Sequence, residues 1–296
     1  MIGQGPIRAR WPDGRWHFQH GPIDLVIGLE GEIRALAAAI EDCWLAFTEV
    51  LPRLVEELKG LRSAWTPALR LQGPVAVRMA RACAPFGSDF GLFITPMAAV
   101  AGAVADHLIV TLRKPGIERA YINNGGDIAL HLTAGACFDV GVVADIRKPP
   151  PQAGEGFDAT LRIDASNPVR GIATSGWRGR SFSLGIADSV TVLALDSAAA
   201  DAAATMIANH VNVAHPAIER APADSLRDDT DLGSRLVTVD VSPLPSREVD
   251  TALDSGLAFA RRCAERGLIH AALLTLQGRT RMLNPHFAAA ALAQIP

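Results

Sequence analysis

Three short segments carry residue types that could bind a nucleotide and a metal. The first is the turn Asn123-Asn124-Gly125-Gly126-Asp127, between two strand-like runs. Adjacent glycines permit positive φ and leave backbone N–H groups unshielded, so the turn could receive a phosphate or a flat ring that a side chain would exclude. The alternative is an ordinary hairpin turn, because Asn-Gly is also the strongest two-residue hairpin signal.

The second segment, Ala173 to Ser181, follows a short strand and combines hydroxyls, glycines and two guanidinium groups. Loops hold phosphate oxygens with such groups, through bidentate and backbone contacts. The spacing matches neither a P-loop nor a nucleophile elbow, and a polar surface turn is the alternative. The residues expected to line or contact phosphate are Thr174, Ser175, Gly176, Arg178 and Arg180.

The third segment is a run of alanines that contains Asp201 and Thr205. Residues four apart on a helix face the same way, and the alanines leave room beside them. A carboxylate and a hydroxyl are hard oxygen ligands suited to Mg²⁺. Alternatively, Asp201 favours the helix dipole and Thr205 bonds back to a carbonyl.

Other side chains give no defensible metal site. The histidine spacings match no zinc site, and the cysteines form no CxxC pair. We therefore expect structural histidines and mostly small, buried cysteines. The cysteines are Cys43, Cys83, Cys137 and Cys263.

Charge and hydropathy exclude two classes of partner. The formal net charge is −3, which provides no basic field for nucleic acid. The most apolar stretch, Leu92 to Leu112, contains Pro96 and Asp106, so it fits a buried helix better than a membrane span. No apolar h-region follows the N-terminal arginines, which predicts a cytoplasmic protein.

Helices and strands alternate irregularly along the chain, which predicts an α+β fold. Apolar residues from Ile33 to Phe47 recur at helical spacing, with Pro52 expected to interrupt or kink the helix. Further predicted helices are 96–113, 197–209 and 247–266, and the predicted strands are 119–122, 128–132, 138–144, 159–163, 171–174 and 189–195. Two strands are expected in 15–29, and another two around Gln277-Gly278. Residues 147–156 and 220–233 are predicted to be loops.

Taken in order, these segments resemble the ApbE-like superfamily, whose best-known members are Mg²⁺-dependent FAD:protein FMN transferases. The matching motifs span about Ile94 to Asn209, and they most resemble an uncharacterised cytoplasmic branch. They are Met97-Ala-Ala-Val-Ala-Gly-Ala-Val-Ala-Asp106, Asn123-Asn-Gly-Gly-Asp-Ile128, Ser175-Gly176, Val190-Thr-Val192 and Ala200-Asp-Ala-Ala-Ala-Thr205. The resemblance implies one domain over 1–296 with mixed or antiparallel sheets and packed helices, comprising an N-terminal subregion 1–90, core motifs 94–210 and a C-terminal helix with two strands over 235–296.

The resemblance also implies a site and a ligand. The metal would be Mg²⁺, held by Asp201, Thr205 and a backbone carbonyl near Val100. The ligand would be FAD, FMN or a related nucleotide. It would be bound by the first segment, which we call the glycine turn, through Asn123, Gly125, Gly126 and Asp127. It would also be bound by the second segment, Ala173 to Ser181, which we call the arginine loop. The family often forms homodimers, and the N-terminal helix could supply a dimer surface, although such a stripe is usually core.

Two departures leave the reaction open. The transferases carry a His-x-x-Asp-Pro-x-Thr-Gly block where this chain has Ser183-Leu-Gly-Ile-Ala-Asp188, and their lysine is replaced by Ala101. The sequence assigns no nucleophile, and Asp127 and Asp188 are candidate bases. A transferase-like enzyme is therefore the leading hypothesis, and a non-catalytic flavin- or nucleotide-binding or regulatory protein is the alternative.

Overall fold

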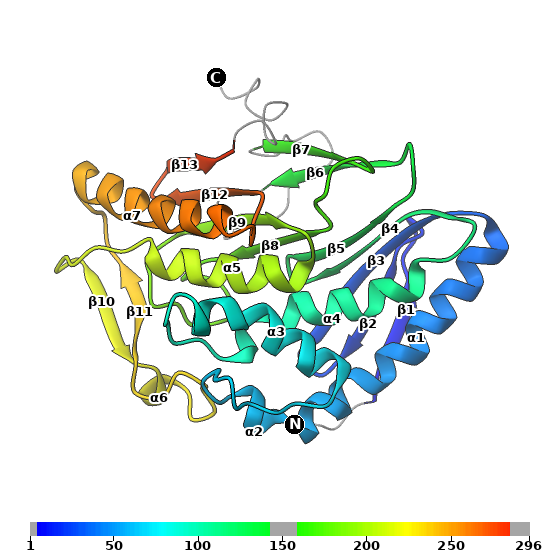
Figure 1. Ribbon diagram of the computed structural model, residues 1–296, viewed down its shortest axis with the longest axis horizontal. Coiled ribbons are helices and arrows are strands. Elements are labelled where there is room, and N and C mark those ends of the chain that lie inside the picture. The colour runs from blue at the N-terminus through cyan, green and yellow to red at the C-terminus, as the bar shows by residue number, and fades with distance from the viewer. Residues whose placement is uncertain (1–4, 143–158, 285–296) are drawn as a thin grey trace. The chain divides into compact units, whose positions relative to one another are not determined.

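The computed structural model describes residues 5–142 and 159–284 (Figure 1). Two compact units share the chain. Unit 1 comprises Met1–Cys137, Asp164–Ala173 and Ala194–Ala202; unit 2 comprises Phe138–Ile163, Thr174–Leu193 and Ala203–Pro296. The predicted loop 147–156 lies outside the described residues. Within the described ranges, no helix has both the length and the hydropathy to cross a membrane.

The sheet of unit 1 is antiparallel, and its first five strands pair in chain order. They are β1 (Ile7–Arg10), β2 (Trp16–His20), β3 (Ile23–Gly31), β4 (Ile117–Asn124) and β5 (Asp127–Leu132). Strand β8 (Gly171–Ser175) adds to β5 through the pair Ile128 and Ile172. In β3 every second residue from Ile23 to Ile27 is buried, because alternate side chains point to the core face.

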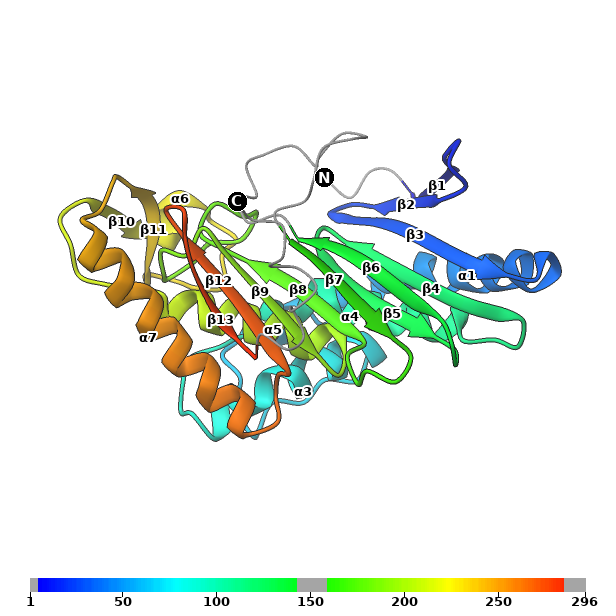
Figure 2. The same ribbon diagram turned by 90° about the horizontal axis from the view of Figure 1, so that it is seen from above.

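Two helices of unit 1, α1 (Ile33–Glu56) and α4 (Val100–Ile109), pack on this core face. The other helical elements of unit 1 are α2 (Leu58–Leu61), α3 (Pro74–Ser88), the 3-10 turn η1 (Pro96–Ala99) and the 3-10 turn η2 (Val110–Leu112). Helix α1 contacts β2 and β3, and α4 contacts β4 and β5. In Figure 2, α3 and α4 lie on one side of these strands.

Helix α1 corrects two details of the prediction. It continues through Pro52 to Glu56, and its buried face is Ala39, Ile40, Cys43, Phe47, Val50 and Leu54. Ile33, at the start of the predicted stripe, is 84% exposed. Of the predicted stripe, Ile40 and Phe47 are core, Leu36 and Trp44 are half-buried and Ala37 is exposed. A homodimer stays a prediction.

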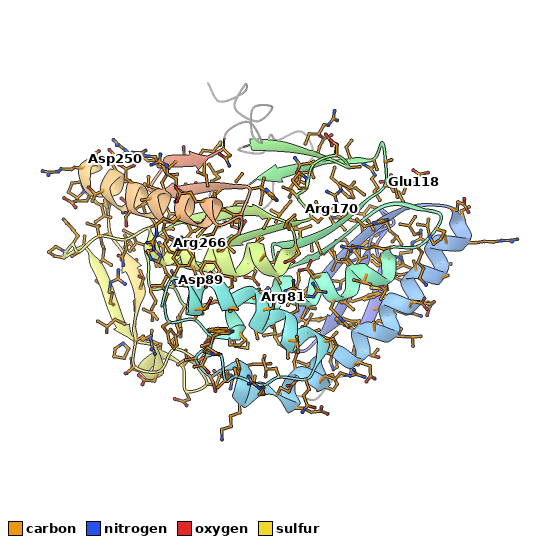
Figure 3. The ribbon with its side chains drawn as sticks, in the orientation of Figure 1. Arg81, Asp89, Glu118, Arg170, Asp250 and Arg266 are labelled. Atoms are coloured by element: carbon orange, nitrogen blue, oxygen red, sulfur yellow. The ribbon has the colours of Figure 1, made fainter. Side chains whose placement is uncertain are left out.

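The segment just before β8 is held in place by one arginine, Arg170, which is labelled in Figure 3. Arg170 donates hydrogen bonds to the carbonyl oxygens of Ala165 at 2.9 Å, Asn167 at 2.5 Å and Val169 at 2.6 Å. These bonds provide donors for three backbone oxygens in the segment that leads from β7 to β8.

Unit 2 contains most of the remaining elements. They are β6 (Cys137–Val142), β7 (Ala159–Asp164), β9 (Ser189–Ala194), α5 (Ser197–His210), β10 (Ile218–Pro222), α6 (Ala223–Leu226), β11 (Leu236–Val241), α7 (Ser246–Glu265), β12 (Ala271–Leu276) and β13 (Arg279–Leu283). The first residues of α5, up to Ala202, belong to unit 1. Strand β12 pairs antiparallel with β9 and β13, and α7 packs on β12 and β13.

Two further predictions meet different outcomes in unit 2. The predicted loop 220–233 is wrong at its start, where the end of β10 and the short helix α6 lie. The residues of β10 do not alternate between buried and exposed, so the sequence lacks the period-two pattern that predicts a strand. The predicted turn at Gln277-Gly278 is confirmed, with φ values of 44° and 78° that suit a tight hairpin.

Candidate functional site

Helix α4 and the first turn of α5 cross at very close range in unit 1. A Cβ atom on Gly102 would lie 2.2 Å from the carbonyl oxygen of Ser197. Only glycine fits there without moving backbone. Ser197 is fully buried at this crossing, whereas Asp201 is half-buried.

Two aspartates bind across this crossing, each to the other helix. Asp201 on α5 accepts a hydrogen bond from the N–H of Gly102 at 3.0 Å. Asp106 on α4 accepts from the N–H groups of Ser197 at 3.0 Å and Ala198 at 2.7 Å. We call this reciprocal pair, Asp106 and Asp201, the carboxylate clasp.

The clasp carboxyls have shifted acidity. Burial raises the pKa of Asp201 and of Asp106, and the nearby Asp196 carboxylate also raises the pKa of Asp106. The backbone N–H groups that each accepts act in the opposite direction, because they favour the charged form. A cation beside these carboxyls would likewise favour the charged form.

The glycine turn reaches the same end of α4. Gly125 and Gly126 have φ values of 66° and 111°, and the N–H of Gly126 donates to Asn123 Oδ1 at 2.8 Å. The Asn124 amide donates to the carbonyl oxygen of Ala101 at 3.1 Å. The hairpin reading is therefore correct for the backbone, and a Cβ on Gly126 would meet nothing within 4 Å.

Unit 1 thus gathers part of the predicted site around the start of α4. Asp201 and Asn124 bind its first turn, and Val100 is the first residue of that helix. Asp127, a candidate base, is 8% exposed. Asp106 and Asn124 stand inside motifs that the sequence singled out, but the sequence assigned neither of them a role. Asn124 lies on β4 opposite Leu25.

The arginine loop is built in unit 2. The Arg178 guanidinium lies 3.6 Å from Asp188 Oδ1 at its Nε and stacks over Trp177 at 4.1 Å. A Cβ on Gly176 would be 2.3 Å from the carbonyl oxygen of Asp188. Thr174 Oγ1 is bonded to Thr191 Oγ1 at 2.9 Å. Ser175 is half-buried and Arg180 is exposed, so this loop does offer a guanidinium to solvent.

The segment that stands in place of the histidine block, Ser183 to Asp188, is held by structural bonds. The Arg220 guanidinium donates to the carbonyl oxygen of Leu184 at 2.6 Å, and Thr238 Oγ1 donates to that of Gly185 at 2.8 Å. Asp188 Oδ2 accepts from the N–H of Gln277 at 2.6 Å. The Asp188 carboxylate therefore accepts a hydrogen bond from a backbone N–H and forms an ion pair with Arg178.

The donor types on α5 fit Mg²⁺. An ionised carboxylate has about four acceptor positions, and the N–H groups of Gly102 and Ala101 bind that of Asp201. Thr205, half-buried in the part of α5 that belongs to unit 2, adds a hydroxyl. Across residues 5–142 and 159–284, no three His, Cys, Asp or Glu side chains group as a metal site. Mg²⁺ usually completes its ligand set with water and with phosphate oxygens of a bound ligand.

Residues 8–282 match the family model described as "AbpE bacteria". The chain belongs to the ApbE-like superfamily. It is similar to UPF0280 proteins of methanogens: 36% identical over 166 residues in Methanospirillum hungatei, covering 55% of this chain and 62% of that protein. In Methanosphaerula palustris the identity is 30% over 207 residues, covering 67% of this chain and 77% of that protein.

The coverage of other relatives is shorter. The match spans 47% of the Methanosarcina barkeri UPF0280 protein and 52% of the Methanothermobacter thermautotrophicus one, so about half of their length. A crystal structure of the Pseudomonas stutzeri flavinyl transferase ApbE, apo form, superposes with a TM-score of 0.50 at 12% identity over 96% of each chain. The predicted α+β, ApbE-like fold is confirmed.

Proposed function

We propose that this protein is an Mg²⁺-dependent enzyme that binds a flavin, FAD or FMN, or a related nucleotide diphosphate, in the manner of a flavin transferase. The observation that carries the proposal is the placement of the Asp201 carboxylate at the first turn of α4, beside the helix start where Val100 stands. Membership of the ApbE-like superfamily supports it.

The chain's own residues would divide the work. Asp201, Thr205 and the Val100 carbonyl would hold the cation, which when bound neutralises charge on phosphate oxygens. Within unit 1, Gly125 and Gly126 would admit the ligand next to backbone. Phosphate contacts by Ser175, Arg178 and Arg180 of unit 2 stay a prediction from residue type. The transferred group and its acceptor are not assigned.

A non-catalytic binding or regulatory protein of the same fold is the second candidate. The hydrogen bonds of the segment Ser183 to Asp188 favour it. The residues that replace the histidine block use their polar groups to hold the backbone of neighbouring segments in place. Binding and chemistry use different residues, so a retained ligand site would not require turnover.

Calorimetry with FAD, FMN and ADP, each with and without Mg²⁺, tests the proposal. We expect Mg²⁺-dependent binding of at least one ligand, and a loss of about tenfold or more in Mg²⁺-dependent affinity in Asp201→Asn, since one charged ligand is removed. Asp254→Asn, on the exposed face of α7, is the matched control.

The outcomes separate the candidates. No binding in the wild type under any condition rejects the proposal. Binding with no change of FAD mass or absorbance on long incubation favours the non-catalytic protein, whereas turnover that disappears in Asp201→Asn favours the enzyme.

A further inference from the structure

The carboxylate clasp has an internal symmetry that points to a role for Asp106. Gly102 and Ser197 meet at the crossing, and each clasp aspartate stands four residues later on its own helix. A spacing of four places Asp106 above Gly102 and Asp201 above Ser197. Each carboxylate therefore binds the N–H groups at the start of the opposite helix.

The clasp supplies side-chain acceptors at both helix starts. The residue before α4, Ala99, makes no side-chain cap, and the Asp201 carboxylate accepts from the N–H of Gly102 in the first turn. Before α5, the Asp196 side chain accepts from the N–H of Ala199 at 2.8 Å, while the N–H groups of Ser197 and Ala198 bind Asp106. Because Ser197 is fully buried, water does not replace a lost partner.

The position of Asp201 thus depends on how α5 is held against α4. Asp201 lies about one turn along α5 from the two N–H groups that Asp106 binds. If those bonds are lost, the first turn of α5 is free to shift, and the Asp201 carboxylate shifts with it. Asp106 does not bind the first turn of α4 itself in any bond that the described residues show.

We propose that Asp106 is a positioning residue: by holding the first turn of α5, it sets where the Asp201 carboxylate lies at the first turn of α4. One consequence of this inference rests on the proposed function: Asp106 supports cation binding by Asp201 without touching the cation. Asp106 itself is 4% exposed and has its oxygens on backbone N–H groups.

Amide hydrogen exchange of the folded full chain tests the geometric part without any metal. In Asp106→Ala we expect exchange to quicken by about tenfold at Ser197 and Ala198, and also at Gly102, whose partner is Asp201. Asp106→Asn keeps one acceptor oxygen and should fall between Asp106→Ala and the wild type. Ile23→Ala, a buried position on β3, supplies a variant of similar stability loss away from the clasp.

Titration with Mn²⁺, a paramagnetic substitute for Mg²⁺, tests the functional part by electron paramagnetic resonance below the unfolding temperature. We expect the Mn²⁺ dissociation constant to rise by about tenfold in Asp106→Ala and to stay within about twofold in Ile23→Ala. A merely structural role would move both variants alike.

Each result has one meaning. Faster exchange at Ser197 and Ala198 with Gly102 unchanged overturns the inference, as does an Mn²⁺ affinity equal in Asp106→Ala and wild type. A wild type that binds no Mn²⁺ while Gly102 exchange quickens in Asp106→Ala overturns the proposed metal site and leaves the positioning of Asp201 supported. If Asp106→Ala fails to fold, Asp106→Asn provides the same two readouts.

Discussion

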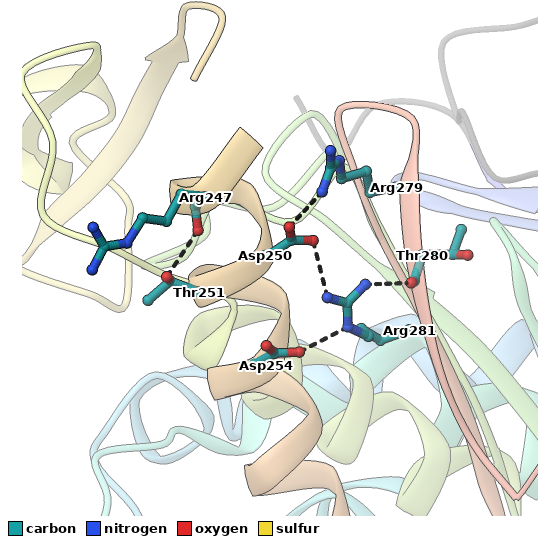
Figure 4. Close-up of polar contacts among 7 residues, drawn as sticks. All are labelled: Arg247, Asp250, Thr251, Asp254, Arg279, Thr280 and Arg281. Atoms are coloured by element: carbon teal, nitrogen blue, oxygen red, sulfur yellow. Dashed lines mark hydrogen bonds and ion pairs between the residues drawn. The ribbon is translucent and has the colours of Figure 1, made fainter. Parts of the chain in front are cut away.

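Two regions of the molecule each contain a pair of aspartates, and the two pairs differ in their exposure to solvent. One pair spans the crossing of α4 and α5, and the other lies one helical turn apart on α7. In unit 1 the carboxylate clasp binds backbone N–H groups, with Asp106 buried and Asp201 half-buried. In unit 2, Asp250 and Asp254 on α7 bind Arg279 and Arg281 on β13, at the surface (Figure 4). The Asp254 side chain is 62% exposed, whereas Asp106 is 4% exposed.

The difference teaches that burial, and not the number of charges, sets what such a pair contributes. A surface ion pair replaces good hydration and contributes about 0–1 kcal/mol. A buried acceptor has no water to take over its donors, so its removal leaves them unpaired. Four substitutions or conditions can break or sharpen this comparison.

The largest effect is expected from Gly102→Ala. The new Cβ would stand 2.2 Å from a backbone oxygen, so the two helices must separate. We expect a loss of about 3 kcal/mol or more in the free energy of unfolding, measured by urea denaturation. Gly60→Ala is the control, because its Cβ would meet only the ends of two flexible side chains, Leu71 at 3.0 Å and Leu69 at 3.8 Å. Equal losses in the two variants would contradict the close crossing.

The next effect is that of Asp106→Ala. It leaves the N–H groups of Ser197 and Ala198 buried without their acceptor, which we expect to cost about 2–4 kcal/mol in urea denaturation. A loss no larger than that of Asp254→Ala would show that burial does not distinguish the two regions.

A smaller effect should follow from acidification, through His210 in unit 2. Its ring stacks on Phe259 with centroids 3.7 Å apart, and burial lowers its pKa. The unfolded chain then binds the proton more readily, so stability is present above the ordinary histidine pKa and is lost as pH falls through it. His210→Phe should flatten the fall in Tm between about pH 7.5 and pH 5. An unchanged slope in the variant would assign that dependence to other groups.

The smallest effect is expected from Asp250→Ala on the exposed network. Its two arginines hold the pKa of Asp250 below the ordinary value through hydrogen bonds, so its contribution is present near neutral pH and lost on strong acidification. We expect a Tm change that shrinks further in about 1 M NaCl, where the Debye length is short. A salt-independent change would indicate packing and not ion pairing.

Much of the fold was accessible from periodicity. Helices α5 and α7, the β12–β13 hairpin and the Asn123–Asp127 turn follow from spacing and turn chemistry. Helix α3 was not predicted, and β10 lacks an alternating pattern. The glycine turn and Asp201 were accessible as candidates because their residue types are unusual at those positions.

The sequence alone determined residue types at a local scale: which segments bend, which faces are apolar and which oxygen groups are available to a cation. Only the tertiary structure decided that Asp106 binds α5, 91 residues along the chain, and that Asp201 binds α4, 99 residues away. The hydrogen bond from the Asn124 amide to the Ala101 carbonyl oxygen and the one from the Gln277 N–H to the Asp188 carboxylate also join a side chain to a distant backbone group. The physical reason is that these bonds end on backbone N–H and C=O groups, which every residue type offers, so no sequence pattern marks the partner.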